Sequence, residues 1–377
     1  MGKICYVTTI AGTLSFFKNQ MVYLSDNGYE VYAISSNRED YKERIGKNTT
    51  FIPVEIARGI SPLTIFKSIF ELKKVFKENK FDIIQYSSPN AAFVASIAAW
   101  LAGAKIRNYH LMGFRYIGEK GVLYYVLKLL EKIACSCSTH IECVSKSNLE
   151  FGVQNGIFKR EKAMVVWNGS SGGINVKRFD HTYREEWRKE IRQKHNIGDD
   201  EFVFGFAGRV TRDKGINELI SAFSQLNNKA KLFIIGRQEG IETLDTDLWS
   251  YAQENPNIII VDFASDIEKY FAAFDVLVLP TYREGFGNVI IEAASVGTPA
   301  IISNIPGPID AVIPGKTAKL VEPKNIVQLY EAMDRMMNNK ALVLEMSKNA
   351  YEFAPGSFDS DKLNEKILER KNMLLGK

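Results

Sequence analysis

Short apolar segments alternate with helix-like segments along almost the whole of this 377-residue chain. The apolar segments read KICYVTTI, YEVYAIS, FDIIQYSS, RNYHLM and HIECVS in the first half, and FVFGFAG, KLFIIG, NIIIV, DVLVLP, PAIIS and AKLV in the second. Helical patterns separate those of the first half, at 15–28, 62–79, 90–103, 121–135 and 146–155. Strands that alternate with helices form parallel sheets covered on both faces. The pattern therefore predicts an α/β protein with two doubly wound, Rossmann-like domains in tandem.

The domain boundary is expected in the polar, glycine-rich stretch NGSSGGINVKRFDHTYRE, at 168–185. We place the first domain at 1–178 and the second at 179–358, with the last helix, within 359–377, packing back on the first. Ligands of doubly wound domains bind beyond the carboxyl ends of the strands. With two such domains facing each other, the natural site is the cleft between them.

Composition favours a reduced, cytoplasmic protein. The four cysteines form no CxxC pair, which favours free thiols over a disulfide framework or a zinc site. The apolar start, MGKICYVTTIAGTLSFF, is interrupted by polar residues and has no cleavage site typical of a signal peptide. The longest apolar run, 91–104, has 14 residues, fewer than the roughly 20 of a membrane-spanning helix. We expect a chain that does not span a membrane.

Charge is distributed unevenly along the chain. Residues 1–180 carry 24 Lys and Arg against 15 Asp and Glu, a balance of +9, so the remainder has a balance of −5. The helical segments TIFKSIFELKKVFKENK and VLYYVLKLLEKIAC in the basic half combine apolar residues with lysines. They are either ordinary amphipathic helices on a core or contacts with an anionic membrane surface. We expect no nucleic acid partner.

The stretch YREGFGNVIIEAASVGTP carries two acids, Glu284 and Glu292, on either side of a predicted strand-to-helix turn. A helix is expected to begin near Phe286 or Gly287 and to end at the Gly-Thr-Pro of 297–299. Eight helical steps rise about 12 Å, which matches the span from a sugar to a ribose across a diphosphate. The amides at the helix start suit an anion. The acids are therefore predicted to hold the two ends of a nucleotide sugar.

A second segment, FAGRVTRDKGINELI, places Arg209 and Lys214 at a strand-to-helix corner. Two cations there suit a departing diphosphate, although a surface ion-pair cluster with their neighbours is the alternative. A third segment, TTIAGTLSFF, has Gly12 at a turn where phosphate or sugar could approach the backbone. It lacks the GxGxxG pattern and is weak evidence alone.

These segments, together with NGSSGGINVKRF, NYHLMGFRYIGEKG and the continuation AIISNIPGPIDAV, resemble the retaining glycosyltransferases of family four, which have the GT-B fold. The resemblance extends over nearly the whole chain and is strongest to bacterial capsule, O-antigen and glycoprotein-glycan enzymes of the CapM-like type. It implies that Glu292 binds the ribose, Glu284 lies beside the transferred sugar, and Arg209 and Lys214 hold the diphosphate. Gly12 matches the glycine of the first-domain loop. The backbone amides implied to meet the sugar and phosphate belong to Phe286, Gly287, Asn288 and Val289.

The chain departs from the family pattern at one position. Many members have a histidine immediately before the glycine of the NYHLMG-equivalent segment, and this chain has Met112 there, with His110 two residues earlier. His110 and Arg115 are the candidates for contact with the sugar, and a core histidine is the alternative for His110.

No metal or other cofactor is expected. The DxD triplets at 245–247 and 359–361 lie away from the predicted strand ends and resemble helix starts, where Asp caps backbone N–H groups. The function expected is metal-independent transfer of a hexose or N-acetylhexosamine, most simply from a UDP-sugar, to a polyprenyl-diphosphate-linked saccharide. The enzyme would be peripheral at the inner face of the cell membrane. The alternatives are a nucleotide-sugar epimerase of the same architecture and a non-catalytic sugar-binding protein.

Overall fold

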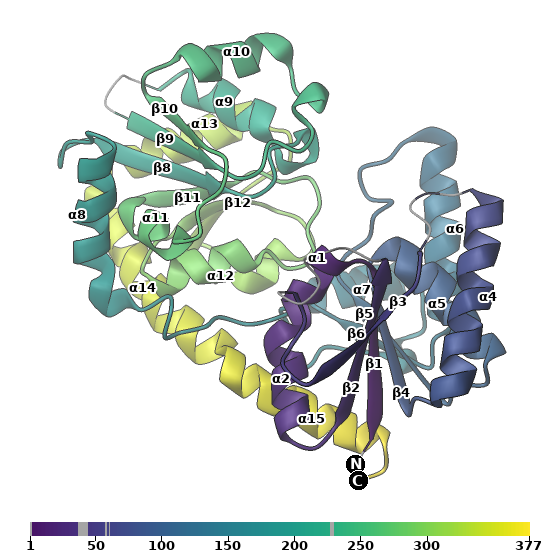
Figure 1. Cartoon of the computed structure of the whole chain (residues 1–377). Helices are drawn as coiled ribbons and strands as arrows, with labels where there is room; N and C mark the ends of the chain where they lie inside the picture. The colour runs from purple at the N-terminus through teal and green to yellow at the C-terminus, as the bar shows by residue number, and fades with distance from the viewer. Residues whose placement is uncertain (1, 37–43, 57–58, 60, 227–229) are drawn as a thin grey trace. The chain divides into compact units, whose positions relative to one another are not determined.

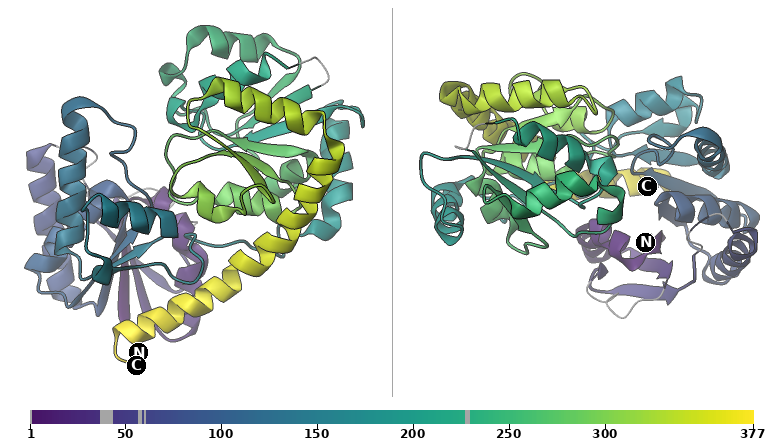
Figure 2. Two further views of the ribbon diagram at one scale, coloured as in Figure 1. Left: turned by 180° about the vertical axis from the view of Figure 1, so that it is seen from behind. Right: turned by 90° about the horizontal axis from the view of Figure 1, so that it is seen from above.

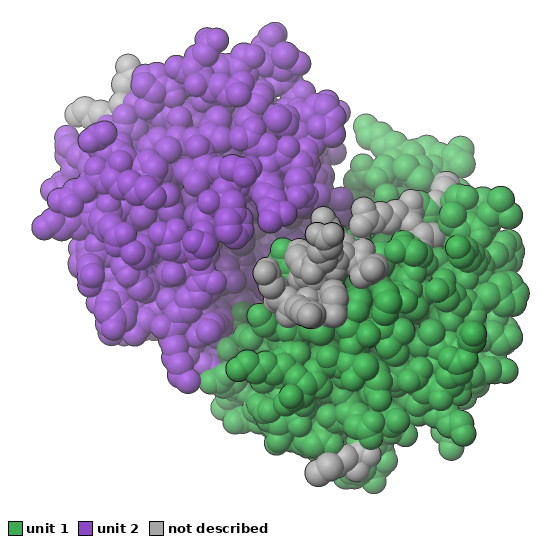
Figure 3. All heavy atoms as spheres, viewed as in Figure 1, with its two compact units in different colours: residues 1–173, 360–377 green, residues 174–359 purple. Residues whose placement is uncertain are grey.

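The chain forms two units in a computed structural model that describes residues 2–36, 44–56, 59, 61–226 and 230–377 (Figures 1 and 2). Unit 1 comprises Met1–Gly173 and Ser360–Lys377, and unit 2 comprises Ile174–Asp359 (Figure 3). The sequence placed the divisions after 178 and 358. In the structure the chain changes unit after Gly173 and again after Asp359.

Unit 1 is built on a parallel sheet with the strand order β3-β2-β1-β4-β5-β6-β7. Its strands are β1 Lys3–Ile10, β2 Glu30–Ser36, β3 Thr49–Pro53, β4 Ile83–Ser87, β5 Ile106–Leu111, β6 His140–Cys143 and β7 Ala163–Met164. Its helices are α1 Ala11–Leu14, α2 Lys18–Asp26, α4 Pro62–Asn79, α5 Pro89–Leu101, α6 Gly121–Cys137, α7 Lys146–Gln154 and α15 Ser360–Leu374. The order reverses between β1 and β4, which is the arrangement that leaves a binding crevice at the strands' carboxyl ends.

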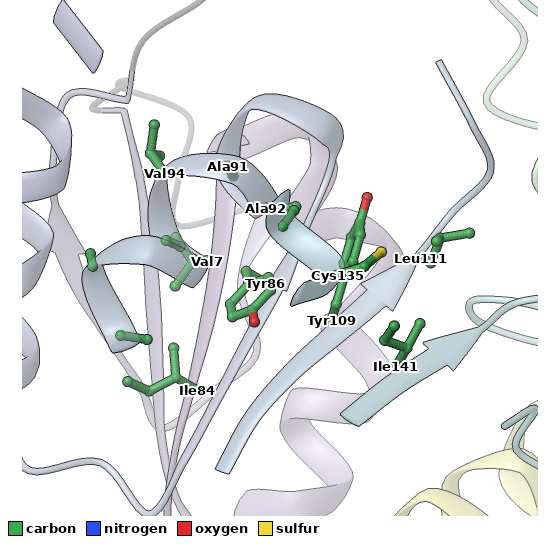
Figure 4. Packing of buried hydrophobic residues seen from close by; sticks show 14 of the residues in the cluster. Val7, Ile84, Tyr86, Ala91, Ala92, Val94, Tyr109, Leu111, Cys135 and Ile141 are labelled. Carbon is green, nitrogen blue, oxygen red and sulfur yellow. The ribbon is translucent and has the colours of Figure 1, made fainter. Parts of the chain in front are cut away.

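The core of unit 1 covers both faces of this sheet. One apolar cluster joins the sheet to α4, α5 and α6, and the alanine-rich face of α5 lies directly on the strands (Figure 4). Ala91, Ala92, Ala95 and Ala98 are fully buried there, so the small side chains let α5 approach the sheet closely. A second cluster joins the sheet to α2.

Strands β3 and β7 were not predicted. The segment TTFIP of β3 is half-buried or exposed along its length, and β7 has two residues. Both strands lie at the edges of the sheet, where a strand is less buried than a central one and needs fewer apolar residues. An apolar run is therefore missing from both, and periodicity alone does not detect them.

The C-terminal helix α15 belongs to unit 1 and inserts a lysine into it. Lys371 is 1% exposed, and its Nζ donates to Glu142 on β6 at 2.8 Å and to the side-chain oxygen of Gln85 on β4 at 2.7 Å. Burial alone would raise the pKa of Glu142, but the charge and hydrogen bonds of Lys371 lower it to about 2. A charged pair buried this deeply is costly to break, since removal of one partner leaves an unpaired buried charge.

Two helices of unit 1 expose large apolar side chains. On α4, Leu63, Phe66 and Phe70 are 83%, 61% and 64% exposed, and on α6, Val122 and Tyr125 are 79% and 71% exposed. Lys67 lies between Phe66 and Phe70 on α4, and Lys128 follows Tyr125 on α6. Within the described ranges, no helix has the length and apolar character needed to cross a bilayer.

Unit 2 is a second parallel sheet, in the order β10-β9-β8-β11-β12-β13. Its strands are β8 Phe202–Ala207, β9 Ala230–Ile235, β10 Ile258–Val261, β11 Val276–Leu279, β12 Ala300–Ser303 and β13 Ala318–Val321. Its helices are α8 Arg184–Lys194, α9 Ile216–Phe223, α10 Thr246–Glu254, α11 Ile267–Ala273, α12 Asn288–Ser295, α13 Ile326–Met337 and α14 Lys340–Phe358. The predicted pair of doubly wound parallel sheets is confirmed, and the order again reverses, here between β8 and β11.

Candidate active site

The two segments singled out in the second half of the sequence meet at the carboxyl ends of β8 and β11, which are neighbours in the sheet. The backbone N–H of Tyr282 donates to the carbonyl of Asp213 at 2.9 Å. The hydroxyl of the fully buried Thr281 donates to the same carbonyl at 3.1 Å. The loop after β11 is therefore fixed by hydrogen bonds on the loop after β8.

Glycine is required where these loops cross. Gly215 has φ 75°, and a Cβ atom there would lie 2.2 Å from the carbonyl oxygen of Pro280. No real Cβ approaches an oxygen so closely. The position after Lys214 must therefore remain glycine for the two loops to lie in contact.

Two ion pairs join the same loops. Lys214 donates to Glu284 at 2.5 Å, and Arg283 lies 2.9 Å from Asp213. We call these four residues the clasp. The side chains of Lys214 and Glu284 are only 13% and 24% exposed, so this pair is partly shielded from water. Burial opposes the ionised form of Asp213, but the hydrogen bond from Thr211 and the neighbouring cations lower its pKa.

Arg209, the other predicted diphosphate ligand, lies just beyond β8 and is exposed. Its positive charge is one of those that lower the pKa of Asp213, after Thr211 and Arg283. Arg209 and Lys214 thus lie on the same connection between β8 and α9, and Lys214 is the last residue of the short helix Arg212–Lys214.

Helix α12 begins at Asn288, beside the clasp, and confirms the predicted helix start. Its N-cap is Gly287, whose φ of 90° is a left-handed conformation that favours glycine. The helix start offers the amides of residues 288 and 289 to an anion. Phe286 is 3% exposed and packs against Phe358, so its side chain belongs to the core and only its backbone faces the loop.

Glu292 lies on α12, half-buried, and burial raises its pKa to about 7. The positive charge of Arg178 acts in the opposite direction, whereas Glu268 adds to the increase. Arg178 is itself engaged by Glu268 at 2.7 Å. The Glu292 carboxyl is therefore poorly solvated, and the nearby Arg178 is already paired with Glu268. Hydroxyl groups of a ligand that donated hydrogen bonds to Glu292 would stabilise its ionised form.

The predicted residues of the first half lie in unit 1, whereas the four residues of the clasp belong to unit 2. Gly12 is in α1, immediately after β1, and among the described residues a Cβ atom there would meet only the Ile10 side chain, at 3.8 Å. Space alone therefore does not require glycine at this position.

His110 is the penultimate residue of β5 and is 7% exposed, with its ring edge-on to Phe17 at a centroid distance of 5.0 Å. Burial lowers its pKa to about 4, which leaves the ring neutral at physiological pH. Among the described residues, its Nε2 atom has no hydrogen-bond partner. These features suit a core histidine, the alternative considered from the sequence, with one nitrogen left to pair with a ligand.

Arg115 follows β5 and is exposed. Its guanidinium donates to the side-chain oxygen of Asn90, the second residue of α5, at 3.1 Å. Asn90 in turn donates to the carbonyl of Gly59 at 3.1 Å. Arg115 is therefore held in place at the carboxyl ends of β4 and β5.

Sequence reasoning missed three contributors to the candidate site: Asp213, Arg283 and Tyr282. From the sequence, Asp213 was considered only as part of a surface ion-pair cluster, and Arg283 was not considered. In the structure these two residues form the second ion pair of the clasp. Tyr282 was also missed: its hydroxyl donates to Glu218 at 2.6 Å, and Lys324 lies 4.5 Å from its ring centre. A pattern in the sequence could have indicated the clasp: an acid precedes a base in Asp213-Lys214, and a base precedes an acid in Arg283-Glu284. The DxD interpretation is confirmed at Asp245, which caps α10 by accepting from two backbone N–H groups.

Comparison with known proteins agrees with this geometry. Residues 3–145 match the family model described as glycosyl transferase 4-like, and residues 188–353 match glycosyl transferases group 1. The two parallel sheets have the GT-B fold, and the two family models place the chain among the glycosyltransferases. The chain belongs to the CapM-like glycosyltransferases: it is 31% identical to the capsular polysaccharide biosynthesis glycosyltransferase CapM of Staphylococcus aureus, over 99% of this chain and 97% of that one.

Other relatives and solved structures extend the comparison. The chain is 25% identical, over 93% of its length and 94% of the relative's, to N,N'-diacetylbacillosaminyl-diphospho-undecaprenol alpha-1,3-N-acetylgalactosaminyltransferase of Campylobacter jejuni. It is 28% identical, over 84% of its length and 81% of the relative's, to UDP-Gal:alpha-D-GlcNAc-diphosphoundecaprenol alpha-1,3-galactosyltransferase of Escherichia coli. The structure of Anabaena HepE in complex with UDP-glucose superposes with a TM-score of 0.78 at 18% identity, covering 99% and 100% of the two chains.

Proposed function

We propose that this glycosyltransferase moves a hexose or N-acetylhexosamine from a UDP-sugar to a hydroxyl group of a polyprenyl-diphosphate-linked saccharide, with retention of anomeric configuration and without a metal. The observation that carries the proposal is the clasp, in which Lys214 and Glu284 pair beside the start of α12. This arrangement brings a cation for phosphate, amides for an anion and a carboxylate for sugar hydroxyls together at the carboxyl ends of β8 and β11.

The Lys214–Glu284 pair suggests how the donor is recognised. A bound diphosphate carries more negative charge than one carboxylate and competes for Lys214. Transfer of the lysine to the phosphate frees Glu284 to accept hydrogen bonds from the sugar. The partial burial of both side chains makes either partnership stronger than it would be in water.

The proposed reaction breaks the bond between the anomeric carbon and the oxygen of the β-phosphate, and the electron pair leaves with UDP. Arg209, Lys214 and the amides of α12 stabilise the charge that develops on the diphosphate. The acceptor oxygen bonds to the anomeric carbon on the face from which UDP departs. Its proton passes to the departing phosphate oxygen. Glu284 orients the sugar and stabilises positive charge at the ring.

The names of two relatives support the donor and acceptor. The Escherichia coli enzyme uses UDP-Gal, and both it and the Campylobacter enzyme act on saccharides linked to diphospho-undecaprenol. CapM supports a role in the synthesis of a surface polysaccharide. Within the chain, Glu292 is proposed to bind the ribose hydroxyls of the nucleotide.

A membrane-held acceptor requires the enzyme to reach an anionic surface. The exposed apolar residues of α4 and α6, interleaved with lysines such as Lys67, Lys74 and Lys128, suit peripheral binding at the inner face of the cell membrane. The basic balance of residues 1–180 acts in the same direction.

The test is incubation of the purified protein with UDP-sugars, with and without lipid-linked saccharides. Transfer of sugar only when acceptor is present supports the proposal, and NMR of the product reports its anomeric configuration. Conversion of the UDP-sugar without acceptor would instead indicate an epimerase. Binding of UDP-sugar with no conversion under either condition would indicate a sugar-binding protein.

A further inference from the structure

The C-terminal end of α12 is closed by a hydrogen-bonded turn. The backbone N–H of Thr298 donates to the carbonyl of Ala293 at 2.9 Å. The backbone N–H of Gly297 donates to the carbonyl of Ala294, also at 2.9 Å. Gly297 has φ 83°, so the turn has the form of a Schellman motif with glycine in the left-handed position. The next carbonyls of the chain, those of Val296 and Gly297, accept hydrogen bonds from side chains of other helices.

Two helices of unit 2 supply these side chains. Arg184, the first residue of α8, donates from Nη1 to the carbonyl of Val296. The same nitrogen donates to Oγ1 of Thr298 at 3.2 Å. Ser347 of α14 donates to the carbonyl of Gly297 at 2.5 Å. Helices α8 and α14 therefore both hold the end of α12.

The positive charge of Arg184 is matched to α12 and not to its own helix. Within the described part of the chain, Arg184 forms no ion pair. Burial and the positive charge of Arg188 lower the pKa of its guanidinium to about 10. The start of a helix favours acids, so a cation at the start of α8 has the unfavourable sign. The carbonyl end of a helix favours cations, so the same charge stabilises α12.

Arg188, one turn further along α8, makes a different contact. It donates to Asp275 at 2.7 Å and, among the described residues, to no atom of α12. Asp275 also accepts from Arg192 at 2.9 Å and from the backbone N–H of Val203 at 2.7 Å. Asp275 therefore keeps two partners when Arg188 is replaced. Arg188 is a matched control for the loss of an arginine from α8.

We propose that Arg184 is a positioning residue for donor binding, which fixes α12 so that its first amides and Glu292 meet the nucleotide sugar. The inference rests on the proposed function and adds to it a residue at the opposite end of α12 from the clasp. Helix α12 has eight residues, so it is only about 12 Å long. Glu292 lies about one turn before Val296, and a shift of the anchored end therefore displaces its carboxylate. Misplacement of a binding group by about 1 Å can lower a rate by roughly 100-fold.

The first test is titration calorimetry with UDP. Arg184→Met removes the charge and the donors but keeps an apolar side chain of similar reach. It should bind UDP about tenfold more weakly, as expected when a charge-assisted hydrogen bond no longer fixes the site. Arg184→Lys, which keeps a cation and a donor, should restore most of the affinity. Ser347→Ala, which frees the same helix end from α14, should weaken UDP binding in the same direction, whereas Arg188→Met should bind normally.

Two further measurements distinguish positioning from a general loss of stability. Because Arg184 is proposed to act through α12, Arg184→Met should weaken UDP binding by much less in a Glu292→Gln background than in the parent. Amide hydrogen exchange in α12, measured without nucleotide, should be faster in Arg184→Met than in the parent. It should be unchanged in Arg188→Met, even at temperatures that lie equally far below the two unfolding midpoints.

Unchanged UDP affinity in a folded Arg184→Met would overturn the inference, and so would equal weakening by Arg184→Met and Arg188→Met. Unchanged exchange in α12 would overturn it whatever the affinity. If Arg184→Met does not fold, Ser347→Ala provides the same comparisons with the same outcomes. The proposed function is tested separately, by sugar transfer in the parent. A parent that binds UDP and transfers no sugar would refute the proposed function and leave the role of Arg184 in UDP binding intact.

Discussion

Glu292→Gln should increase stability and weaken nucleotide binding at the same time. The parent carboxyl has its pKa raised from 4.5 to about 7 by burial. A folded-state pKa above the unfolded value means that its stabilising contribution is fully present below pH 4.5 and is lost as pH rises through 7. Above pH 7 the folded protein contains a desolvated carboxylate, which lowers its stability. Glutamine is uncharged and avoids this cost.

The magnitude follows from the shift. At about 1.4 kcal/mol per pKa unit, a shift of this size corresponds to at most roughly 3.5 kcal/mol of unfolding free energy. Because Glu292 is only half-buried, solvent screening reduces this to about 1–2 kcal/mol. The variant should match the parent near pH 4.5 and exceed its unfolding free energy by that amount at pH 8.

Nucleotide binding should change in the opposite direction. A ribose diol that donates to a carboxylate forms charge-assisted hydrogen bonds, of about 1.5–3 kcal/mol. Titration calorimetry at pH 8 should therefore show UDP binding at least about tenfold more weakly to Glu292→Gln.

Calorimetric unfolding of parent and variant from pH 4.5 to 8 measures the stability change. Glu131 in unit 1 has a pKa raised in the same direction, so the difference between the two proteins isolates Glu292. Glu345→Gln, an exposed acid on α14, is the control and should change neither property. The same pH dependence in Glu292→Gln as in the parent would refute the buried-acid argument, and unchanged UDP affinity would refute the ribose role.

The remaining predictions concern catalysis, metal and membrane. Arg209→Ala or Lys214→Ala should lower kcat by roughly 100-fold, about 3 kcal/mol, in a transfer assay, as for a lost transition-state donor; a normal kcat would exclude the diphosphate role. Turnover in excess chelator should equal turnover with magnesium, and activity that a divalent ion alone restores would contradict metal independence. The protein should co-sediment with anionic liposomes at low salt and leave them as salt rises, because each lysine near the surface contributes about 1 kcal/mol. Charge reversal at Lys67, Lys73, Lys74 and Lys77 should weaken binding to anionic liposomes and leave UDP binding unchanged. Equal binding to neutral and anionic liposomes would contradict an electrostatic contribution to membrane binding.

The regular elements were predictable from apolar periodicity. The segment 62–79 is helix α4 with the predicted bounds, and α12 begins one residue after Gly287. Apolar periodicity predicts these elements because each of them buries one or both of its faces in a core. It missed β3 because an edge strand needs no continuous apolar run. The predicted division after 178 differs from that after Gly173 because polar linker residues and polar starts of secondary structure have similar composition.

The site was predictable to the level of motifs. Glycines and paired acids are typical of a loop that approaches a ligand, so Glu284 and Gly287 could be selected as candidates from the sequence. The partnership of Lys214 with Glu284 was not, since 70 residues separate them and only the adjacency of β8 and β11 brings them together. Lys371 was missed for the same reason, because a lysine on a polar helix gives no indication that its ammonium group will be buried.

The buried lysine of α15 has a consequence for the order of synthesis and folding. The ribosome synthesises Gln85, Glu142 and the strands around them long before residue 371. Glu142 therefore lacks its partner Lys371 while the whole of unit 2 is synthesised. Unit 2, as one continuous stretch, is complete first. Unit 1 closes last, when Lys371 replaces water around Glu142. A nascent chain halted between residues 360 and 370 therefore contains the whole sequence of the second unit and an incomplete first one.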